Sequence, residues 1–403
     1  MSYFLDHTDS TYARGSVRIT GSKSESNRLL VLQDLFPQIR IENLSDSDDT
    51  KHLITALQSK ATKINIGHAG TAMRFLTALF AAKKGQTIQL TGSNRMQNRP
   101  IKILVEALKQ LGASIQYVEK HGYPPLVING RELSENKVLI SGQVSSQYIS
   151  ALLLIAPYLR NGLELQISGK LTSVPYVNMT LSLLQEIGVT AQWKADRILV
   201  SRLEKPSKKT LIVSPDWSSA SYFYSLVALQ DSSNVELPGF KSDSRQGDQA
   251  IVDYYKAFGV RTRFTSKGIV LTKTAGFKQD KKLEFDLVNT PDLAQTIAVT
   301  CLGLGVDCHL RGLHTLKIKE TDRLVALKNE LEKLGAKVLI SEKDLQLFSP
   351  SIIQENCHIH TYQDHRMAMA FAPLSTLVPI YIEDEAVVSK SYPGFWLDFE
   401  SLF

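Results

Sequence analysis

The sequence predicts a two-domain α/β protein on the basis of its length, a recurring helix–strand pattern and the mixed order of its elements. The chain has 403 residues, whereas a single hydrophobic core usually stops growing near ~250–300 residues. Amphipathic helices that end at a glycine and lead into a strand occur four times. Helices and strands that alternate in this way favour layers in which helices pack on sheets.

The recurring pattern places each glycine where a helix ends and a strand begins. A glycine at that position adopts the left-handed conformation at no steric cost, which ends the helix and turns the chain. The cap glycines lie about 75 residues apart, too far for solenoid units of about 20–50 residues. They therefore indicate a few copies of a larger α/β unit. The four copies are Ile103–Tyr117, Leu181–Trp193, Ile251–Phe264 and Arg323–Ile340, with glycines at 112, 188, 259 and 335.

Apolar periodicity predicts six further helices between these copies. They cover Ser26–Phe36, Thr71–Ala82, Ser146–Tyr158, Ser218–Leu229, Asp292–Leu304 and His365–Leu377.

Two crossings between domains are expected, although no low-complexity linker marks them. One lies near Thr20/Gly21 and the other near Ser214/Pro215, where the proline interrupts the strand-like run Thr210–Val213. The first domain is then residues 1–20 with 215–403, and the second is residues 21–214. An N-terminal strand would belong with the C-terminal half.

Composition indicates a globular protein with a weak preference for anions. Hydrophobic residues make up 43% and charged residues 21% of the chain, and the formal net charge is +6. Basic runs are short, the densest being Lys205, Lys208 and Lys209, so neither nucleic acid nor a membrane surface is an expected partner.

The cysteines and the apolar segments indicate a reducing, cytoplasmic location. Cys301, Cys308 and Cys357 are too few and too dispersed for a disulfide framework. Met1–Ser10 lacks the basic and apolar regions of a secretory signal. The apolar run Ile149–Leu159 is too short to span a bilayer.

Gly21–Arg28 begins a helix with small hydroxyl residues and places Lys23 and Arg28 near its N-terminal end. Backbone N–H groups and two cations there form a candidate anion site. A serine-capped surface helix is an equally acceptable interpretation of this segment alone.

Gly67–Arg74 is a second glycine-containing loop that enters a helix, and Gly70 would let a ligand approach the backbone. The alternative is a tight turn with Thr71 as N-cap. Downstream, Arg95 and Arg99 precede a helix whose first residue is expected to be Pro100. Arg99 could hold a carboxylate or phosphate, or could simply be solvated.

Two polar corners could recognise a sugar or a phosphate. Ser145, Ser146 and Gln147 begin an apolar helix. Ser173 and Tyr176 flank Pro175 and form a similar corner, which by itself is only a turn.

The densest cluster is Lys319–Arg323, for which Thr321 is the expected N-cap. A cation in the first turn of a helix opposes the helix dipole, and a bound anion would relieve that conflict. Asp364 is likewise an expected N-cap, and His365 and Arg366 place two potential cations in the first turn of the helix that follows it. Lys390 lies near the C-terminus. Asp292 opens its own helix and is either a cap or a general base.

A metal site is the remaining alternative, because Cys357, His358, His360 and His365 fall close together. In a strand, His358 and His360 share a face while Cys357 points away, so surface histidines on an edge strand are the preferred interpretation. No metal and no cofactor are expected.

Taken together, seven segments resemble the 5-enolpyruvylshikimate-3-phosphate (EPSP) synthase family over nearly the whole chain. All seven occur in the family's order, so an accidental match is implausible. They are Gly-Ser-Lys-Ser-Glu-Ser-Asn-Arg at 21–28, Ala-Gly-Thr-Ala-Met-Arg at 69–74, Ser-Ser-Gln at 145–147, Asp-Trp-Ser-Ser-Ala-Ser-Tyr-Phe at 216–223, Gln-Gly-Asp at 246–248, Lys-Glu-Thr-Asp-Arg at 319–323 and Asp-His-Arg-Met-Ala-Met at 364–369.

The resemblance implies a fold and a reaction. The fold is an inside-out α/β barrel of two domains, each with three βαβαββ units, that closes on its substrates as a monomer. The reaction transfers the enolpyruvyl group of phosphoenolpyruvate to the 5-hydroxyl of shikimate 3-phosphate in the shikimate pathway, and glyphosate inhibits the family. His68, Phe75 and Thr315 depart from the family's usual residues, whereas Gly70 favours glyphosate sensitivity because a small residue leaves room.

By position, the resemblance also implies which residues bind each substrate. The phosphoenolpyruvate ligands are Lys23, Gly70, Arg99, Gln147, Arg323, Arg366 and Lys390. The shikimate 3-phosphate ligands are Lys23, Ser24, Arg28, Ser145, Ser146, Gln147, Ser173, Tyr176, Asp292 and Lys319. Asp292, Glu320 and Lys23 are left for proton transfer: Asp292 takes the hydroxyl proton while Glu320, with Lys23, protonates the methylene carbon.

Two other functions stay open. The related enolpyruvyl transferase that acts on UDP-N-acetylglucosamine shares the architecture, but its loop cysteine has no counterpart before Cys301. A phosphate-binding or RNA-binding protein could use the same cations without turnover; steep salt dependence would identify the latter.

Overall fold

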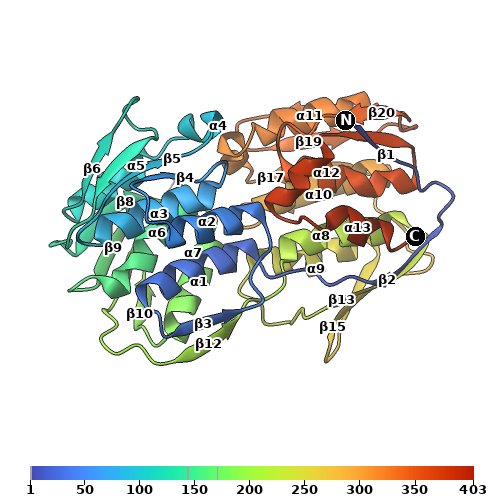
Figure 1. Ribbon diagram of the computed structural model, residues 1–403. Coiled ribbons are helices and arrows are strands. Elements are labelled where there is room, and N and C mark those ends of the chain that lie inside the picture. The colour runs from blue at the N-terminus through green and yellow to red at the C-terminus, as the bar shows by residue number, and fades with distance from the viewer. Residues whose placement is uncertain (1, 143–144, 170) are drawn as a thin grey trace. The chain divides into compact units, whose positions relative to one another are not determined.

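Two compact units make up the protein, as seen in a computed structural model that describes residues 2–142, 145–169 and 171–403 (Figure 1). Unit 1 comprises Met1–Thr20 and Ser214–Phe403, and unit 2 comprises Gly21–Val213. Each unit has a separate hydrophobic core, as expected for a chain too long to bury one core. The second domain predicted from the sequence ends at residue 214, whereas the contacts of Ser214 place it in unit 1.

Four sheets, two in each unit, share one strand order. Two parallel strands come first, and an antiparallel hairpin then adds to the second of them, which is the βαβαββ pattern. In unit 2 these sheets are β4 (Lys63–Asn65), β5 (Thr87–Thr91), β7 (Leu126–Asn129) and β6 (Ser114–Tyr117), and β8 (Lys137–Ser141), β9 (Leu163–Ser168), β11 (Arg197–Val200) and β10 (Ala191–Lys194). In unit 1 they are β2 (Tyr12–Ser16), β13 (Ser232–Pro238), β15 (Gly268–Lys273) and β14 (Val260–Phe264), and β16 (Lys282–Asp286), β17 (Asp307–Arg311), β19 (Leu345–Phe348) and β18 (Lys337–Ile340).

A smaller third sheet completes each unit. In unit 2, β3 (Ile39–Glu42) pairs in parallel with β12 (Lys209–Ile212). In unit 1, β21 (Ile380–Glu383) pairs in parallel with β20 (Cys357–Ile359) and antiparallel with β1 (Ser2–Leu5). The N-terminal strands β1 and β2 therefore lie in sheets with strands from the C-terminal half of the chain.

The predicted cap glycines are confirmed. The φ angles of Gly112, Gly188, Gly259 and Gly335 are +98°, +93°, +73° and +99°, in the left-handed region. The helices that they follow are α5 (Lys102–Gln110), α7 (Val174–Glu186), the short α9 (Ile251–Tyr254) with a 3₁₀ turn at Tyr255–Phe258, and α11 (Arg323–Lys333). A strand follows within a few residues in each case, so the recurring pattern in the sequence reflects the repeated sheet.

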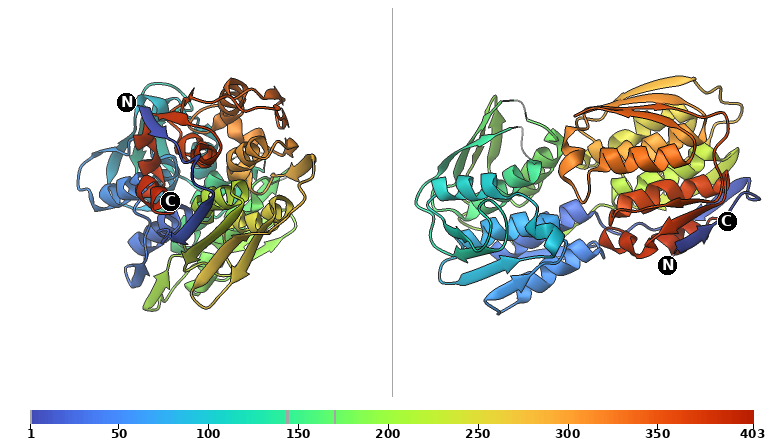
Figure 2. Two further views of the ribbon diagram at one scale, coloured as in Figure 1. Left: turned by 90° about the vertical axis from the view of Figure 1, so that its right-hand side faces the viewer. Right: turned by 90° about the horizontal axis from the view of Figure 1, so that it is seen from above.

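The helices at the centre of each unit are buried all round, which is why apolar residues occur on all sides of them and not along one stripe. All 13 residues of α3 (Gly70–Ala82) and all 7 residues of α12 (His365–Phe371) are buried. In unit 2, α3 packs on α1 (Lys23–Leu35) and α6 (Ser146–Ile155); in unit 1, α10 (Ala294–Gly303) packs on α8 (Trp217–Leu229) and α12. Figure 2 shows helices of unit 1 lying between its sheets.

Some predicted boundaries were wrong. α5 begins at Lys102 rather than at Pro100, because Ile101 keeps the extended φ of −138°. Three helices escaped prediction: α2 (Asp48–Gln58), whose first turn is acidic, and the short α4 (Asn94–Gln97) and α13 (Phe395–Glu400).

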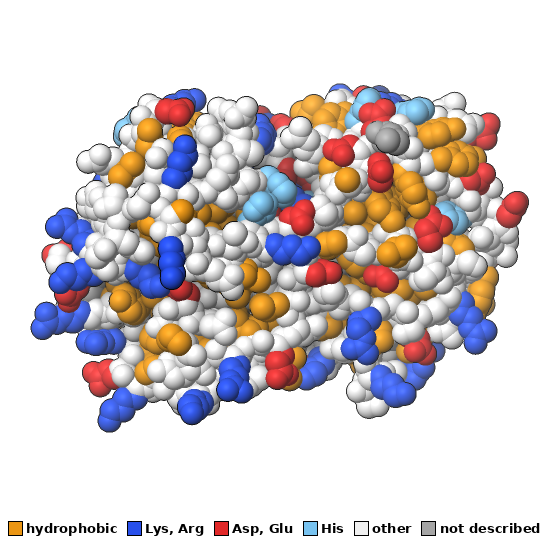
Figure 3. Space-filling model, in the orientation of Figure 1, with side chains coloured by type: hydrophobic (Ala, Val, Ile, Leu, Met, Phe, Trp, Pro, Cys, Tyr) orange, Lys and Arg blue, Asp and Glu red, His pale blue; other side chains and the backbone are white. Residues whose placement is uncertain are grey.

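The surface agrees with the weak net charge. On the face drawn in Figure 3, Lys and Arg side chains are interspersed with Asp and Glu. Among the described residues, none of the helices has the length and apolar character needed to cross a bilayer.

Candidate functional site

The first turn of α11 places Arg323 at the centre of a buried cluster in unit 1. Only 2% of its side chain is exposed. Its Nη1 lies 2.9 Å from Asp292 Oδ1, its Nη2 lies 2.9 Å from Glu320 Oε2, and its Nε lies 2.6 Å from Asp364 Oδ2.

The predicted N-cap of α11 was wrong: Asp322, not Thr321, caps this helix, accepting from the N–H groups of Leu324 and Val325. A carboxylate accepts two such bonds more strongly than a hydroxyl does.

Asp364 connects the two arginines that the sequence singled out. It is fully buried and contacts Arg323 through both carboxylate oxygens, at 2.6 and 3.3 Å. Its Oδ1 also accepts from the backbone N–H of Arg366 at 3.0 Å, which confirms Asp364 as the N-cap of α12. One carboxylate therefore orients Arg323 and fixes the start of the helix that carries Arg366.

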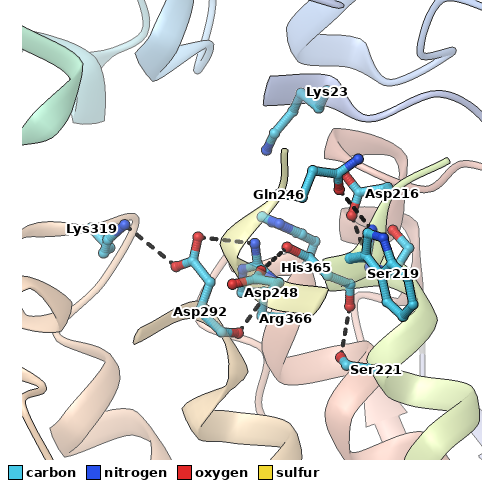
Figure 4. A network of polar contacts seen from close by, with 12 residues as sticks. Lys23, Asp216, Ser219, Ser221, Gln246, Asp248, Asp292, Lys319, His365 and Arg366 are labelled. Atoms are coloured by element: carbon cyan, nitrogen blue, oxygen red, sulfur yellow. Dashed lines mark hydrogen bonds and ion pairs between the residues drawn. The ribbon is translucent and has the colours of Figure 1, made fainter. Parts of the chain in front are cut away.

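Asp292 lies among three cations, of which Lys319 and Arg366 are labelled beside it in Figure 4. Its Oδ2 is 3.1 Å from Arg366 Nη2, and its Oδ1 is 3.4 Å from Lys319 Nζ and 2.9 Å from Arg323 Nη1. Burial raises the pKa of this carboxyl, but Arg366, Lys319 and Arg323 outweigh burial and hold the pKa well below its ordinary value. Asp292 is therefore ionised. It lies in the 3₁₀ turn Pro291–Leu293 that leads into α10.

Glu320 joins Lys390 to the same cluster. Its Oε1 is 2.8 Å from Lys390 Nζ, and the Lys390 side chain is 7% exposed. Lys319, Arg323, Arg366 and Lys390 together outnumber Asp292, Glu320 and Asp364 by one charge. Such a set of guanidinium and ammonium groups can bind phosphate or carboxylate in a setting where charge interactions are strong.

The 3₁₀ turn Gly247–Ala250 and its N-cap bring Asp248 and Gln246, to which sequence reasoning gave no role beyond the motif, against the start of α8. Asp248 is buried and accepts from the Ser218 hydroxyl. Burial, with the nearby charge of Asp292, raises the pKa of Asp248 to about 7. Gln246 accepts from the N–H of Trp217 and donates to the carbonyl of Pro215, both at 2.8 Å.

In unit 2, Lys23 begins α1 and faces the first turn of α2. Its Nζ lies 3.6 Å from Asp49 Oδ2, and the Asp49 side chain is 4% exposed. Ser47 caps α2, as its hydroxyl accepts from Thr50 N. Asp49 was missed because α2 itself was missed; the serine followed by two aspartates at 47–49 was the available signal.

Gly70 and Arg99 are brought together where α3 begins. A Cβ at position 70 would lie 2.6 Å from Arg99 Nη1, so the space left by the glycine is filled by this guanidinium. Gly70 is itself the first residue of α3 and Ala69 is the N-cap, so the expected capping by Thr71 is wrong. The Thr71 hydroxyl instead accepts from Gln147 Nε2 at 3.2 Å, which joins the starts of α3 and α6.

Arg28 is buried among three helices of unit 2. It donates to Thr180 Oγ1 (2.8 Å), Ser150 Oγ (2.9 Å) and the carbonyls of Ser24 and Tyr176 (2.8 and 3.3 Å). Burial lowers the pKa of Arg28 to about 10. Phe75, which departs from the family's residue, lies under this guanidinium at 5.4 Å. Among the described residues these four bonds leave one of five N–H groups for a ligand.

The two polar corners lie at the starts of α6 and α7. Ser145 is the N-cap of α6 and accepts from Gln147 N at 3.4 Å, and Ser146 is buried. Ser173 adopts a left-handed φ of 55° immediately before α7, and Tyr176 lies in the first turn of that helix. Polar groups at these helix starts suit a phosphate or a hydroxylated ring.

The histidines near residue 360 lie at the edge of a sheet. His358 and His360 contact different oxygens of the Glu383 carboxylate, which is 34% exposed. Over the described part of the chain, no three His, Cys, Asp or Glu side chains come together as a metal site requires.

The fold and these clusters define a class of protein: a two-unit α/β protein in which Lys and Arg side chains gather at the starts of its central helices. The sequence matches the model of one family, EPSP synthase (3-phosphoshikimate 1-carboxyvinyltransferase), over residues 58–399. The chain belongs to the EPSP synthase family.

Named relatives and solved structures agree. The 3-phosphoshikimate 1-carboxyvinyltransferase of Bacteroides fragilis (strain YCH46) is 45% identical over 391 residues, covering 96% of this chain and 94% of that protein. The enzyme of the same name from Pasteurella multocida (strain Pm70) is 36% identical over 422 residues, covering 96% of this chain and 94% of that protein.

Solved structures share the fold at low sequence identity. EPSP synthase from Acinetobacter baumannii has a TM-score of 0.78 at 20% identity, covering 100% of this chain and 98% of that one. The enolpyruvyl transferase NikO from Streptomyces tendae has a TM-score of 0.74 at 15% identity, with 99% and 97% covered.

Proposed function

We propose that this enzyme transfers the enolpyruvyl group of phosphoenolpyruvate to the 5-hydroxyl of shikimate 3-phosphate, giving 5-enolpyruvylshikimate 3-phosphate and phosphate. This is a step of the shikimate pathway toward chorismate and the aromatic amino acids. The observation that carries the proposal is the cluster in which Arg323, Arg366 and Lys390 surround Asp292 and Glu320. It combines cations for an anionic substrate with two carboxylates for proton transfer.

Binding roles follow from the chemistry of each position. For phosphoenolpyruvate we assign the cations that line the two clusters together with the residues beside them: Lys23, Gly70, Arg99, Gln147, Arg323, Arg366 and Lys390. For shikimate 3-phosphate we assign the helix-start hydroxyl, amide and cationic groups, with two residues of unit 1: Lys23, Ser24, Arg28, Ser145, Ser146, Gln147, Ser173, Tyr176, Asp292 and Lys319. Units 1 and 2 are then the two domains of the enzyme.

The chemistry is an addition followed by an elimination. The 5-hydroxyl oxygen bonds to C2 of phosphoenolpyruvate as its proton passes to Asp292, while Glu320, with Lys23, gives a proton to the methylene carbon. For this step Glu320 must first take up a proton in place of its ion pairs with Arg323 and Lys390. In the tetrahedral intermediate a methyl proton then returns to Glu320, while Asp292 gives its proton to the departing phosphate oxygen as the C–O bond to phosphate breaks, which restores the double bond and releases phosphate. Lys and Arg groups stabilise the charge on phosphate and carboxylate throughout.

Ion pairing in the cluster explains how Asp292 could become a base. Its low pKa reflects its contacts with Arg366, Lys319 and Arg323. If the phosphate and carboxylate of phosphoenolpyruvate take over two of these cations, Asp292 loses their stabilisation and its pKa rises. Binding of one substrate would thus prepare the site for the other.

Phosphate release tests the proposal. The purified protein is mixed with phosphoenolpyruvate and shikimate 3-phosphate, each omitted in turn, and with UDP-N-acetylglucosamine as alternative acceptor. We expect phosphate only from the first pair. Asp292→Asn and Glu320→Gln should each lower kcat by about 10²–10⁴. Asp253→Asn serves as control because that carboxylate is 75% exposed. Wild-type kcat in either site variant would remove that residue from the chemistry.

We also propose that the enzyme acts as a monomer in the cytoplasm. All of the assigned groups come from one chain, and the three cysteines are free thiols, as suits a reducing compartment.

A further inference from the structure

The two arginines of the unit 1 cluster lie on different helices, so their relative position needs support. Arg323 begins α11 and Arg366 lies in the first turn of α12. Asp364 connects them at one point. Glu330 follows Arg323 by two helical turns, so its side chain lies on the same face of α11. The Glu330 side chain can therefore make a second connection between α11 and the segment before α12.

Glu330 makes that second connection with a fully buried carboxylate. Its Oε1 accepts from the Tyr362 hydroxyl at 2.6 Å, and its Oε2 accepts from the backbone N–H of His360 at 3.0 Å. Lys333, 2.6 Å from Oε2, neutralises the charge and also donates to the carbonyl of His358 at 3.0 Å. A carboxylate is retained in this interior position because three donors satisfy it.

The segment that Glu330 holds has an unfavourable backbone conformation. Tyr362 and Gln363 have φ angles of 54° and 57°, so two successive residues with side chains are left-handed. Such residues cost conformational free energy and persist where their surroundings fix them. Asp364 follows directly, and its N–H bonds to the carbonyl of Thr361 at 2.9 Å. The left-handed pair thus determines where Asp364 lies and how α12 begins.

We propose that Glu330 and Tyr362 are positioning residues: they hold segment 360–364, with its left-handed pair Tyr362 and Gln363, in place and thereby set Arg366 relative to Arg323. Tyr362 serves as the donor, and burial and its bond to Glu330 raise its pKa to about 12, which keeps the hydroxyl protonated. The consequence for catalysis rests on the proposed binding of phosphoenolpyruvate by both arginines. Neither residue of the pair is among the substrate ligands assigned above.

Tyr362→Phe tests the proposal, because it removes one hydroxyl and leaves Glu330 with Lys333 and the His360 N–H. Tyr3→Phe is a matched control: it removes another tyrosine–glutamate bond of unit 1, from Tyr3 to Glu400, away from the segment. We expect Tyr362→Phe to raise KM for phosphoenolpyruvate about tenfold, the value of one hydrogen bond to a charged group. kcat and KM for shikimate 3-phosphate should stay within about twofold. Tyr3→Phe should change none of these.

Two further measurements separate positioning from general stability. Adding Gln363→Gly to Tyr362→Phe lowers the cost of the left-handed backbone, so it should recover part of the lost affinity for phosphoenolpyruvate. Amide hydrogen exchange at residues 360–366 should be faster in Tyr362→Phe than in Tyr3→Phe and wild type. Unchanged exchange there overturns the proposal whether or not the enzyme is active. With an active wild type, an unchanged KM for phosphoenolpyruvate, or equal changes for both substrates, overturns it as well. Absence of wild-type turnover contradicts instead the proposed function.

Discussion

Asp364→Asn should destabilise unit 1 and weaken phosphoenolpyruvate binding, although the two side chains have nearly the same shape. The asparagine can still cap α12, because its oxygen can accept from the N–H of Arg366. The other arm then becomes an NH₂ group that faces the Nε–H of Arg323, where Asp364 Oδ2 accepts at 2.6 Å. Two donors would oppose each other in a place that excludes water.

The magnitude follows from burial. Removing one partner of a buried ion pair costs about 3–5 kcal/mol, and the lower end applies because Arg323 keeps Asp292 and Glu320. For a domain of this size about 1 kcal/mol shifts Tm by roughly 2–4 °C, so unit 1 should melt about 6–12 °C lower. KM for phosphoenolpyruvate should rise about tenfold, since Arg323 loses a charge-assisted contact that orients it.

Asp253→Asn provides the matched comparison. Asp253 pairs with Lys256 at 2.6 Å, as closely as Asp364 pairs with Arg323, but its side chain is 75% exposed. An exposed pair contributes little because water solvates both partners. Scanning calorimetry and steady-state kinetics of both variants would decide the matter. Equal melting temperatures in the two variants would refute the argument that burial makes the Asp364 contact important.

Three further outcomes are expected. Burial raises the pKa of Asp248 from 3.8 to about 7, so its contribution to stability is complete below pH ~4 and is lost as the pH rises to ~7; Asp248→Asn should flatten the Tm profile across that range, and a parallel profile would contradict the shift. Gly70→Ala should raise KM for phosphoenolpyruvate several-fold with little change in Tm, because the new methyl group displaces the flexible end of Arg99; an unchanged KM would show that Arg99 tolerates the move. Chelator should leave kcat unchanged, since Arg323, Arg366 and Lys390 supply the positive charge; lost activity that added metal restores would point to an ion.

Local sequence determined the repeated architecture. A glycine is the residue that turns from helix to strand at no steric cost, so Gly112, Gly188, Gly259 and Gly335 reveal the repeats without knowledge of the fold. The apolar run of α3 likewise predicted a helix over Thr71–Ala82. The cationic residues at helix starts, Lys23, Arg323 and Arg366, were likewise visible, because a cation there conflicts with the helix dipole unless an anion is near.

Tertiary structure alone decided what those cations contact. Nothing local predicts that Asp364 reaches Arg323 across 41 residues, that Arg99 fills the space beside Gly70, or that Glu330 secures Tyr362. The choice of Asp322 over Thr321 as N-cap was also invisible, because both residue types cap helices and backbone geometry selects between them. Sequence specifies which groups carry charge, but the strength of a charge interaction depends on burial and distance, which only packing of distant segments sets.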